Sequence, residues 1–137
     1  MLRNNQTNML LGSIAKLNSK KMYPDTPITM IVNGALISGT ITNEEEYYSL
    51  ELNIAHKELY EIAIKEPQEK YFGENAEDVA EDDAPDYLRQ QFIYLKNAYY
   101  VFGDKTIPSV GNKGISIQVR LADVSAFNFG NLSFSQD

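Results

Sequence analysis

An Asn-Gly pair between two runs of β-branched residues is the feature that most constrains how this chain folds. The stretch "ITMIVNGALISGTIT", residues 28–42, places such runs on either side of Asn33-Gly34. Asn-Gly is the strongest short-range signal of a two-residue β-hairpin. A second glycine, Gly39, lies inside the second run, and glycine in a strand marks a bend or the close approach of another backbone. We therefore predict a hairpin whose second strand bends at Gly39.

Three later segments carry strand patterns. Residues 91–102, "QFIYLKNAYYVF", are rich in aromatics, and residues 115–125, "ISIQVRLADVS", alternate apolar and polar side chains. Residues 126–134, "AFNFGNLSF", fit a short last strand, whereas "GDKTIPSVGNKG" at 103–114 is typical of turns. Four or five short strands with mostly antiparallel connections close most easily as a small barrel. The predicted fold is α+β: a small antiparallel barrel of the Sm-like or SH3-like kind, with an N-terminal helix and an inserted helix.

The N-terminal segment has helical spacing. Met9 or Leu10, Ile14 and Leu17 share one face of a helix over residues 5–18, with Lys16 and Asn18 off that face. The breaker cluster "YPDTP" at 23–27 then begins the domain proper. We expect a helix and linker at 1–22 and one barrel domain at 23–137.

Residues 43–65 support two interpretations. The apolar positions between 48 and 54 alternate as in a strand, yet Tyr48, Leu52 and residues beyond them step by four and three as in a helix. Asn43, with Glu46 three residues later, is typical of a helix start. We favour one helix over about 44–64, ended by Pro67, and keep a strand at 47–54 as the alternative.

The negative charge is localised. The protein has a net charge of −7, and residues 74–86 hold seven acids and no base, including Glu77, Asp78, Glu81, Asp82 and Asp83. An acidic chain without a basic stripe is a poor candidate for binding nucleic acid. The segment is predicted to be a mobile, solvated insertion, and the alternative is an interaction segment for a basic partner.

Few residues suit catalysis or metal binding. The chain has no cysteine, and His56 is its single histidine, a pattern that fits a surface residue better than a catalyst or ligand. We predict no metal, no cofactor and no enzymatic activity, with an acid–base enzyme using paired carboxylates as an outside hypothesis. The absence of cysteine suits a reducing compartment, and no apolar run approaches the roughly 20 residues of a membrane span. A cytoplasmic protein without membrane contact is expected.

Tyrosines gather in the strand at 91–102. Tyr94, Tyr99 and Tyr100 occupy alternating and adjacent positions, so both faces of the strand carry aromatics. One interpretation buries one face and covers the other with a helix. The other leaves a tyrosine-rich surface for a protein partner, since tyrosine is enriched at interfaces.

Most of the chain, from Ile28 to Leu132, resembles the gas vesicle accessory protein family GvpU. The resemblance is carried by "VNGALISGTIT" (32–42), "FIYLKNA" (92–98), Ile107-Pro108 and "VRLADVSAFNFGNL" (119–132). The chain departs from the family pattern at Tyr94 and Ala126, as a distant member would. The resemblance implies a non-enzymatic accessory protein of gas vesicle formation or clustering. Its partners would be gas vesicle shell or accessory proteins, or copies of itself as a homo-oligomer. The alternative is a self-associating Sm-like interaction module without a gas vesicle role.

Overall fold

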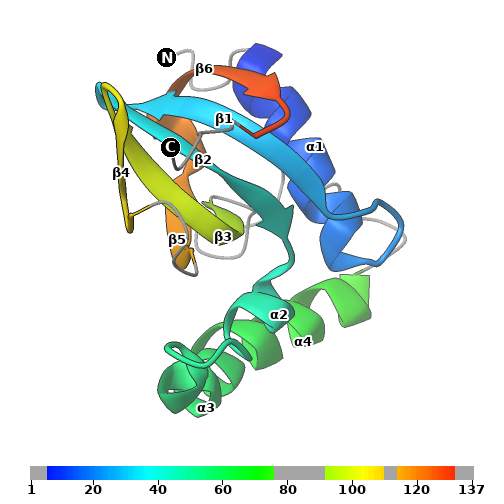
Figure 1. The fold of residues 1–137 in the computed structure, drawn as a ribbon. Helices are drawn as coiled ribbons and strands as arrows, with labels where there is room; N and C mark the ends of the chain where they lie inside the picture. Colours follow the sequence, from blue (N-terminus) through cyan, green and yellow to red (C-terminus); the bar gives the residue numbers. More distant parts are fainter. Residues whose placement is uncertain (1–5, 76–91, 110–113, 132–137) are drawn as a thin grey trace. The chain divides into compact units, whose positions relative to one another are not determined.

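The computed structural model describes residues 6–75, 92–109 and 114–131. The chain divides into two compact units, which we name the sheet unit (residues 1–47 and 91–137) and the helical unit (residues 48–90). The predicted acidic insertion at 74–86 lies outside the described residues from position 76 onward. Figure 1 shows the elements of both units.

The sheet unit contains a helix, α1, and six antiparallel strands. Helix α1 spans Gln6–Ser19, and a one-turn helix, α2, spans Glu44–Tyr47. The strands are β1 Thr26–Val32, β2 Ala35–Thr42, β3 Phe92–Phe102, β4 Lys105–Ile107, β5 Ile115–Arg120 and β6 Val124–Phe129. A 3₁₀ turn, η5, spans Leu121–Asp123 between β5 and β6. Mixed helix and strand, as the sequence predicted, is confirmed.

The first two strands are joined by a two-residue turn. Val32 pairs with Ala35, and the residues between them, Asn33 and Gly34, have φ of 49° and 83°. Positive φ at both central positions defines the turn type that matches the twist of a hairpin. Asparagine and glycine tolerate this conformation better than other residues, so the local sequence dictates the connection.

The sheet is open, so the predicted closed barrel is wrong. The strand order is β4-β3-β2-β1-β6, and β5 pairs with β3 beside β4. Among the described strands, β6 pairs with β1 and does not pair with β4 or β5. The count also differs from the expected four or five, because β4 lies in the stretch 103–114 that we assigned to turns. Closure is not needed to bury the inner face, since α1 packs against β2, β3 and β6 (Figure 1).

A bulge in β3 divides that strand into two halves. Its pairing with β5 shifts register between Leu95 and Ala98, and its pairing with β2 shifts between Ser38 and Thr40. Asn97, inside the bulge, has a φ of 50°. The extra residue changes which side chains face the core, because Leu95 and Ala98 are both fully buried there. The first half of β3 then pairs with β5 and the end of the second half pairs with β4.

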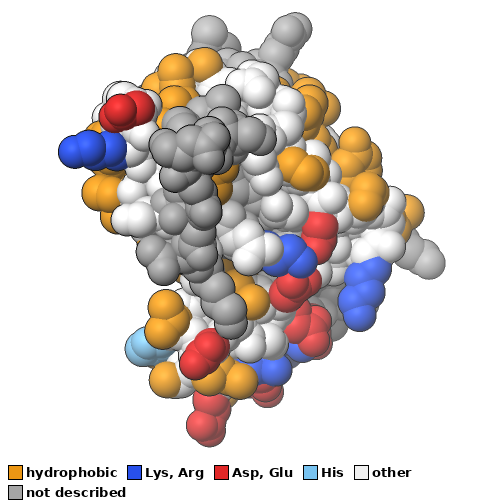
Figure 2. Space-filling model, in the orientation of Figure 1, with side chains coloured by type: hydrophobic (Ala, Val, Ile, Leu, Met, Phe, Trp, Pro, Cys, Tyr) orange, Lys and Arg blue, Asp and Glu red, His pale blue; other side chains and the backbone are white. Residues whose placement is uncertain are grey.

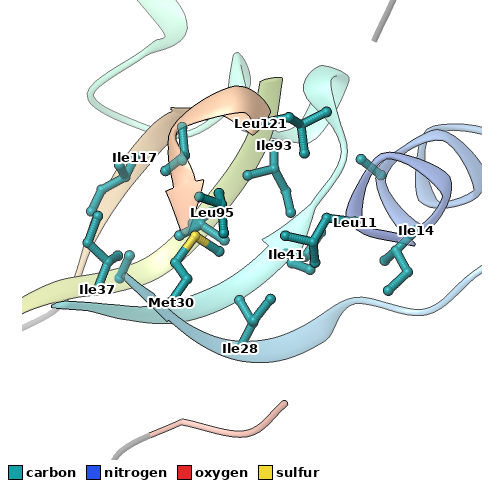
Figure 3. Close-up of a cluster of buried hydrophobic side chains, with 14 residues drawn as sticks. Leu11, Ile14, Ile28, Met30, Ile37, Ile41, Ile93, Leu95, Ile117 and Leu121 are labelled. Carbon is teal, nitrogen blue, oxygen red and sulfur yellow. The ribbon is translucent and has the colours of Figure 1, made fainter. Parts of the chain in front are cut away.

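The hydrophobic core lies between α1 and the inner face of the sheet. Figure 3 shows Leu11 and Ile14 of α1 pointing toward side chains of β1, β2 and β3. The predicted helix over 5–18 is therefore confirmed, but its orientation differs from the prediction. Leu11 is fully buried, whereas Met9 and Leu10 are exposed, and Asn18 is buried.

The helical unit is described from Tyr48 to Asn75. A turn at 48–53 precedes the 3₁₀ turn η1 (Ile54–His56). Helix α3 (Lys57–Tyr60), the π-helical turn η2 (Glu61–Lys65) and helix α4 (Glu66–Asn75) then follow without interruption. The alternative strand at 47–54 is wrong, and so is the single helix over 44–64, because the turn at 48–53 separates α2 from the rest.

Pro67 does not end the helix as predicted. Proline lacks the N–H for the bond to the carbonyl four residues back, and its ring clashes with that carbonyl. The wider π-helical turn η2 comes immediately before it and relaxes this requirement, so the helix continues to Asn75.

Candidate functional site

The helical unit exposes four large aliphatic side chains that are close together in the sequence. Leu52, Ile54, Leu59 and Ile62 expose 77%, 56%, 67% and 58% of their surface. We name these four residues the apolar patch. Figure 2 shows hydrophobic side chains at the surface in the lower part of the view, over the helices of this unit. Single exposed apolar residues are ordinary, whereas contiguous exposed apolar surface marks interaction sites, so we treat these four as a candidate site.

Local structure explains why the apolar patch faces outward. Tyr60 is the buried residue of α3, and its ring stacks on that of Tyr48 with centroids 4.3 Å apart. Leu59 and Ile62 are one residue before and two residues after Tyr60, about 100° and 200° around the helix, so neither lies on the face that Tyr60 buries. The patch is thus the part of the helical surface that its own tyrosine pair does not cover.

Polar and charged side chains connect α1, α2 and β3 with Asp25, which directly precedes β1. The Lys96 ammonium of β3 lies 2.6 Å from Asp25 Oδ2 and 2.7 Å from Glu46 Oε1 of α2. Asn18, at the end of α1, donates a hydrogen bond to Asp25 Oδ1 at 3.0 Å. Burial alone raises the pKa of Asp25, but the hydrogen bonds from Asn18 and Lys96 and the charge of Lys96 outweigh it and lower that pKa. This arrangement fixes α1 and α2 on the sheet, which is a structural role.

A second polar group in the sheet unit surrounds Glu44. Burial raises the pKa of Glu44 to about 7, although the hydrogen bond from Tyr94 acts in the opposite direction. The ring of Tyr47 lies 4.9 Å from that of Tyr94. Helix α2 begins here as the sequence indicated, because Asn43 Oδ1 accepts a hydrogen bond from the Glu46 N–H at 2.7 Å.

The tyrosines predicted for a binding surface differ in accessibility. Tyr94 is only 4% exposed, so it offers little surface to a partner. Tyr99 and Tyr100 are half-buried, and Tyr100 packs against the core. The predicted acidic contact residues lie outside the described residues: Glu77, Asp78, Glu81, Asp82 and Asp83.

Gly39 lies against the bulge of β3, opposite Ala98. A Cβ at Gly39 would stand 2.7 Å from Ala98 Cβ and 3.1 Å from Ala98 Cα. Gly114 approaches the same bulge from the β5 side, where a Cβ would stand 2.4 Å from the carbonyl carbon of Asn97. The positive φ belongs to Asn97 of β3 and not to Gly39 of β2. The two glycines therefore leave room for the bulge from both sides.

Residues suited to catalysis are not brought together in the described part of the chain. His56 is exposed at the end of η1. No group of three or more histidine, cysteine or carboxylate residues with metal-binding geometry occurs among residues 6–75, 92–109 and 114–131.

Comparison with known proteins assigns a family. The family model described as "Gas vesicle protein GvpU-like" matches residues 8–132, nearly the whole chain. The chain belongs to the GvpU-like family. The match begins at residue 8, so it includes most of α1 as well as the segments from Ile28 onward that carried the resemblance in sequence. The description of the GvpU-like family associates its members with gas vesicles.

The other comparisons give no relative for this GvpU-like chain. No curated protein and no solved structure matches it. In the described residues, no helix is both long enough and apolar enough to span a membrane.

The apolar patch is the site that sequence analysis missed. The spacing of Leu52, Leu59 and Ile62 predicted a helix, and an apolar face with that spacing is ordinarily buried. Tyr60 is the residue that could have shown otherwise. It lies off that apolar face, and it is the buried residue of α3. Periodicity identifies the apolar face of a helix, but it does not reveal whether the same chain covers it.

Proposed function

We propose that this protein is a non-enzymatic accessory protein that acts through protein–protein contacts in gas vesicle formation or clustering in the cytoplasm. Membership of the GvpU-like family supports the link to gas vesicles. The single structural observation that supports a contact role is the apolar patch, four exposed aliphatic side chains on the helical unit.

The charges around the apolar patch favour a protein over a nucleic acid as the partner. Between residues 48 and 75 there are six glutamates and three lysines. A phosphate backbone would be repelled by this surface, since nucleic acid binding depends on lysine and arginine neutralising phosphates. An apolar centre with a polar rim is instead the usual composition of a protein interface.

Three protein partners suit the proposal: a gas vesicle shell protein, another gas vesicle accessory protein, or a second copy of this chain. The first two are tested in one assay with purified gas vesicles, which float when centrifuged at low speed, whereas a second copy is tested by self-association of the purified protein. Tyr99 and Tyr100 stay candidate contact residues alongside the apolar patch.

The test measures whether the purified protein floats with purified gas vesicles. We expect co-flotation of the wild type, and a several-fold smaller bound fraction for the double variant Leu52→Ser, Ile54→Ser. The matched control is Met22→Ser, because Met22 is also strongly exposed but lies outside the apolar patch. Contacts made by exposed charges should weaken with added salt, whereas apolar contacts should persist. Tight DNA or RNA binding without co-flotation would overturn the proposal and favour the Sm-like alternative.

A further inference from the structure

Two residues of the apolar patch share one side of a continuous helix. Leu59 and Ile62 are three residues apart within the helical run from Lys57 to Asn75, about 4.5 Å along its axis. Residues at this spacing are neighbours on a helix surface. Leu52 and Ile54, from the turn before the helix, extend the same unit's exposed apolar surface. A helix with such a face is suited to packing against another helix.

The charges beside this pair are self-complementary. Glu58 comes one residue before Leu59, and Lys65 comes three residues after Ile62. A two-fold axis midway between Leu59 and Ile62 would place each Leu59 opposite the Ile62 of an antiparallel second helix. Glu58 would then lie within about two residues, or about 3 Å along the axis, of the other copy's Lys65. Symmetry produces this pairing twice.

We propose that the apolar patch binds a second copy of this chain, with the two helices antiparallel across Leu59 and Ile62 and with reciprocal Glu58–Lys65 pairs. The inference rests on the proposed function only in treating the apolar patch as a protein contact surface. A second copy suits this surface better than an unrelated protein, because its aliphatic and charged residues are complementary to themselves. A two-fold contact also closes on itself, so it joins two copies and no more.

The contact is small. Four aliphatic side chains from each copy and two ion pairs cover less than the roughly 1,200–2,000 Å² of a stable complex. The association is therefore expected to be weak and reversible. Sedimentation velocity and light scattering over a wide concentration range are the suitable measurements.

A charge exchange tests the register of the two helices. Glu58→Lys alone and Lys65→Glu alone should each weaken dimerisation of the full chain by about three- to tenfold, because each places like charges opposite each other. The double variant Glu58→Lys, Lys65→Glu should restore dimerisation to within about twofold of wild type. Glu69→Lys makes the same charge change farther along the helix and should leave the dimer unchanged. Failure of the double variant to restore dimerisation would overturn the antiparallel pairing.

Substitution of the aliphatic pair tests the centre of the contact. Leu59→Gln with Ile62→Gln should weaken dimerisation by at least about tenfold, since the transfer free energy of two aliphatic side chains is lost. Met22→Gln, in the sheet unit, should have no effect. A wild-type protein that stays monomeric at every concentration would overturn the inference. Co-flotation with gas vesicles, measured separately, would in that case leave the proposed function standing.

Discussion

At the scale of single residues, the bulge at Asn97 governs the sheet. In a regular strand, side chains point alternately to the two faces of the sheet. The extra residue of the bulge reverses this alternation in the middle of residues 91–102. Tyr99 and Tyr100 therefore do not take the faces that counting from Leu95 assigns to them. The cause is recognisable in the sequence only in part, because asparagine is tolerant of positive φ but does not require it.

Gly39→Val tests the close approach of β2 and β3. The added side chain would overlap Ala98, whose Cβ and Cα stand 2.7 and 3.1 Å from the new Cβ. We expect a loss of about 1–3 kcal/mol in the free energy of unfolding, measured by urea denaturation. Gly12→Ala is the control, because its Cβ would make an ordinary contact 3.7 Å from Leu121 Cδ1. If Gly39→Val and wild type had the same free energy of unfolding, β2 and β3 would be able to move apart there without loss of stability.

The sequence predicted Gly39 as a special position, and it did so from one physical fact. Glycine inside a β-branched run is costly unless a backbone needs the space. It did not reveal which strand holds the bulge, because that depends on β3, which is more than fifty residues away. Gly114 was overlooked for the same reason: it lies in a turn-rich stretch, where glycine needs no special explanation.

Glu44 provides a pH-dependent contribution to stability. Its pKa is raised to about 7 in the fold from an ordinary 4.5. The protonated form is favoured by folding, so this contribution is fully present below about pH 4.5 and is lost as the pH rises through about 7. Glu44→Gln should unfold with a free energy about 1–3 kcal/mol greater than wild type near pH 8, and the difference should close near pH 4. An identical pH profile for Glu44→Gln and wild type would contradict the assignment.

At the scale of elements, α1 is the clearest case of a correct helix with an incorrect face. The spacing of Leu10, Ile14 and Leu17 is as helical as that of Leu11, Ile14 and Ala15. The structure buries the second set, and it also buries Asn18, whose amide binds Asp25 and the Tyr23 carbonyl. The periodicity of apolar residues takes no account of such polar partners, although they contribute to which face of the helix is buried. The predicted division of the chain into a helix and linker at 1–22 and a domain at 23–137 stays a prediction.

Two adjacent leucines of α1 allow a buried position, Leu11, to be compared with an exposed one, Leu10. Leu11→Ala should lower the free energy of unfolding by about 2–5 kcal/mol, since Leu11 is fully buried between α1 and the sheet. Leu10→Ala removes the same atoms from an exposed position and should change it by about 0.5 kcal/mol or less. Chemical denaturation of both variants measures the difference. Equal losses would mean that the helix is rotated relative to the structure.

At the scale of the whole molecule, antiparallel strands and helices were predictable and their closure was not. The structure contains a strand in each segment whose local pattern predicted one, although the strand predicted at 115–125 ends at Arg120 and β6 begins at Val124. Whether β6 pairs with β5 depends instead on strand curvature and on what covers the inner face. Helix α1 supplies that cover through Leu11, Ile14 and Ala15. Strands that bury their inner face only against one another favour a closed barrel, which is why we predicted one. Here a helix packs on that inner face, so the sheet stays open.

Folding and self-association should respond to different residues of the molecule. Leu59→Gln with Ile62→Gln alters exposed positions, so the free energy of unfolding at low protein concentration should stay within about 0.5 kcal/mol of wild type. A wild-type dimer gains stability by mass action, about 1.4 kcal/mol per mole of dimer and so about 0.7 kcal/mol per chain, for each tenfold rise in concentration above its dissociation constant. The wild-type melting temperature should therefore rise with protein concentration, and that of the double variant should not. A double variant that melts far below wild type even in dilute solution would instead show that Leu59 and Ile62 are part of the folded core.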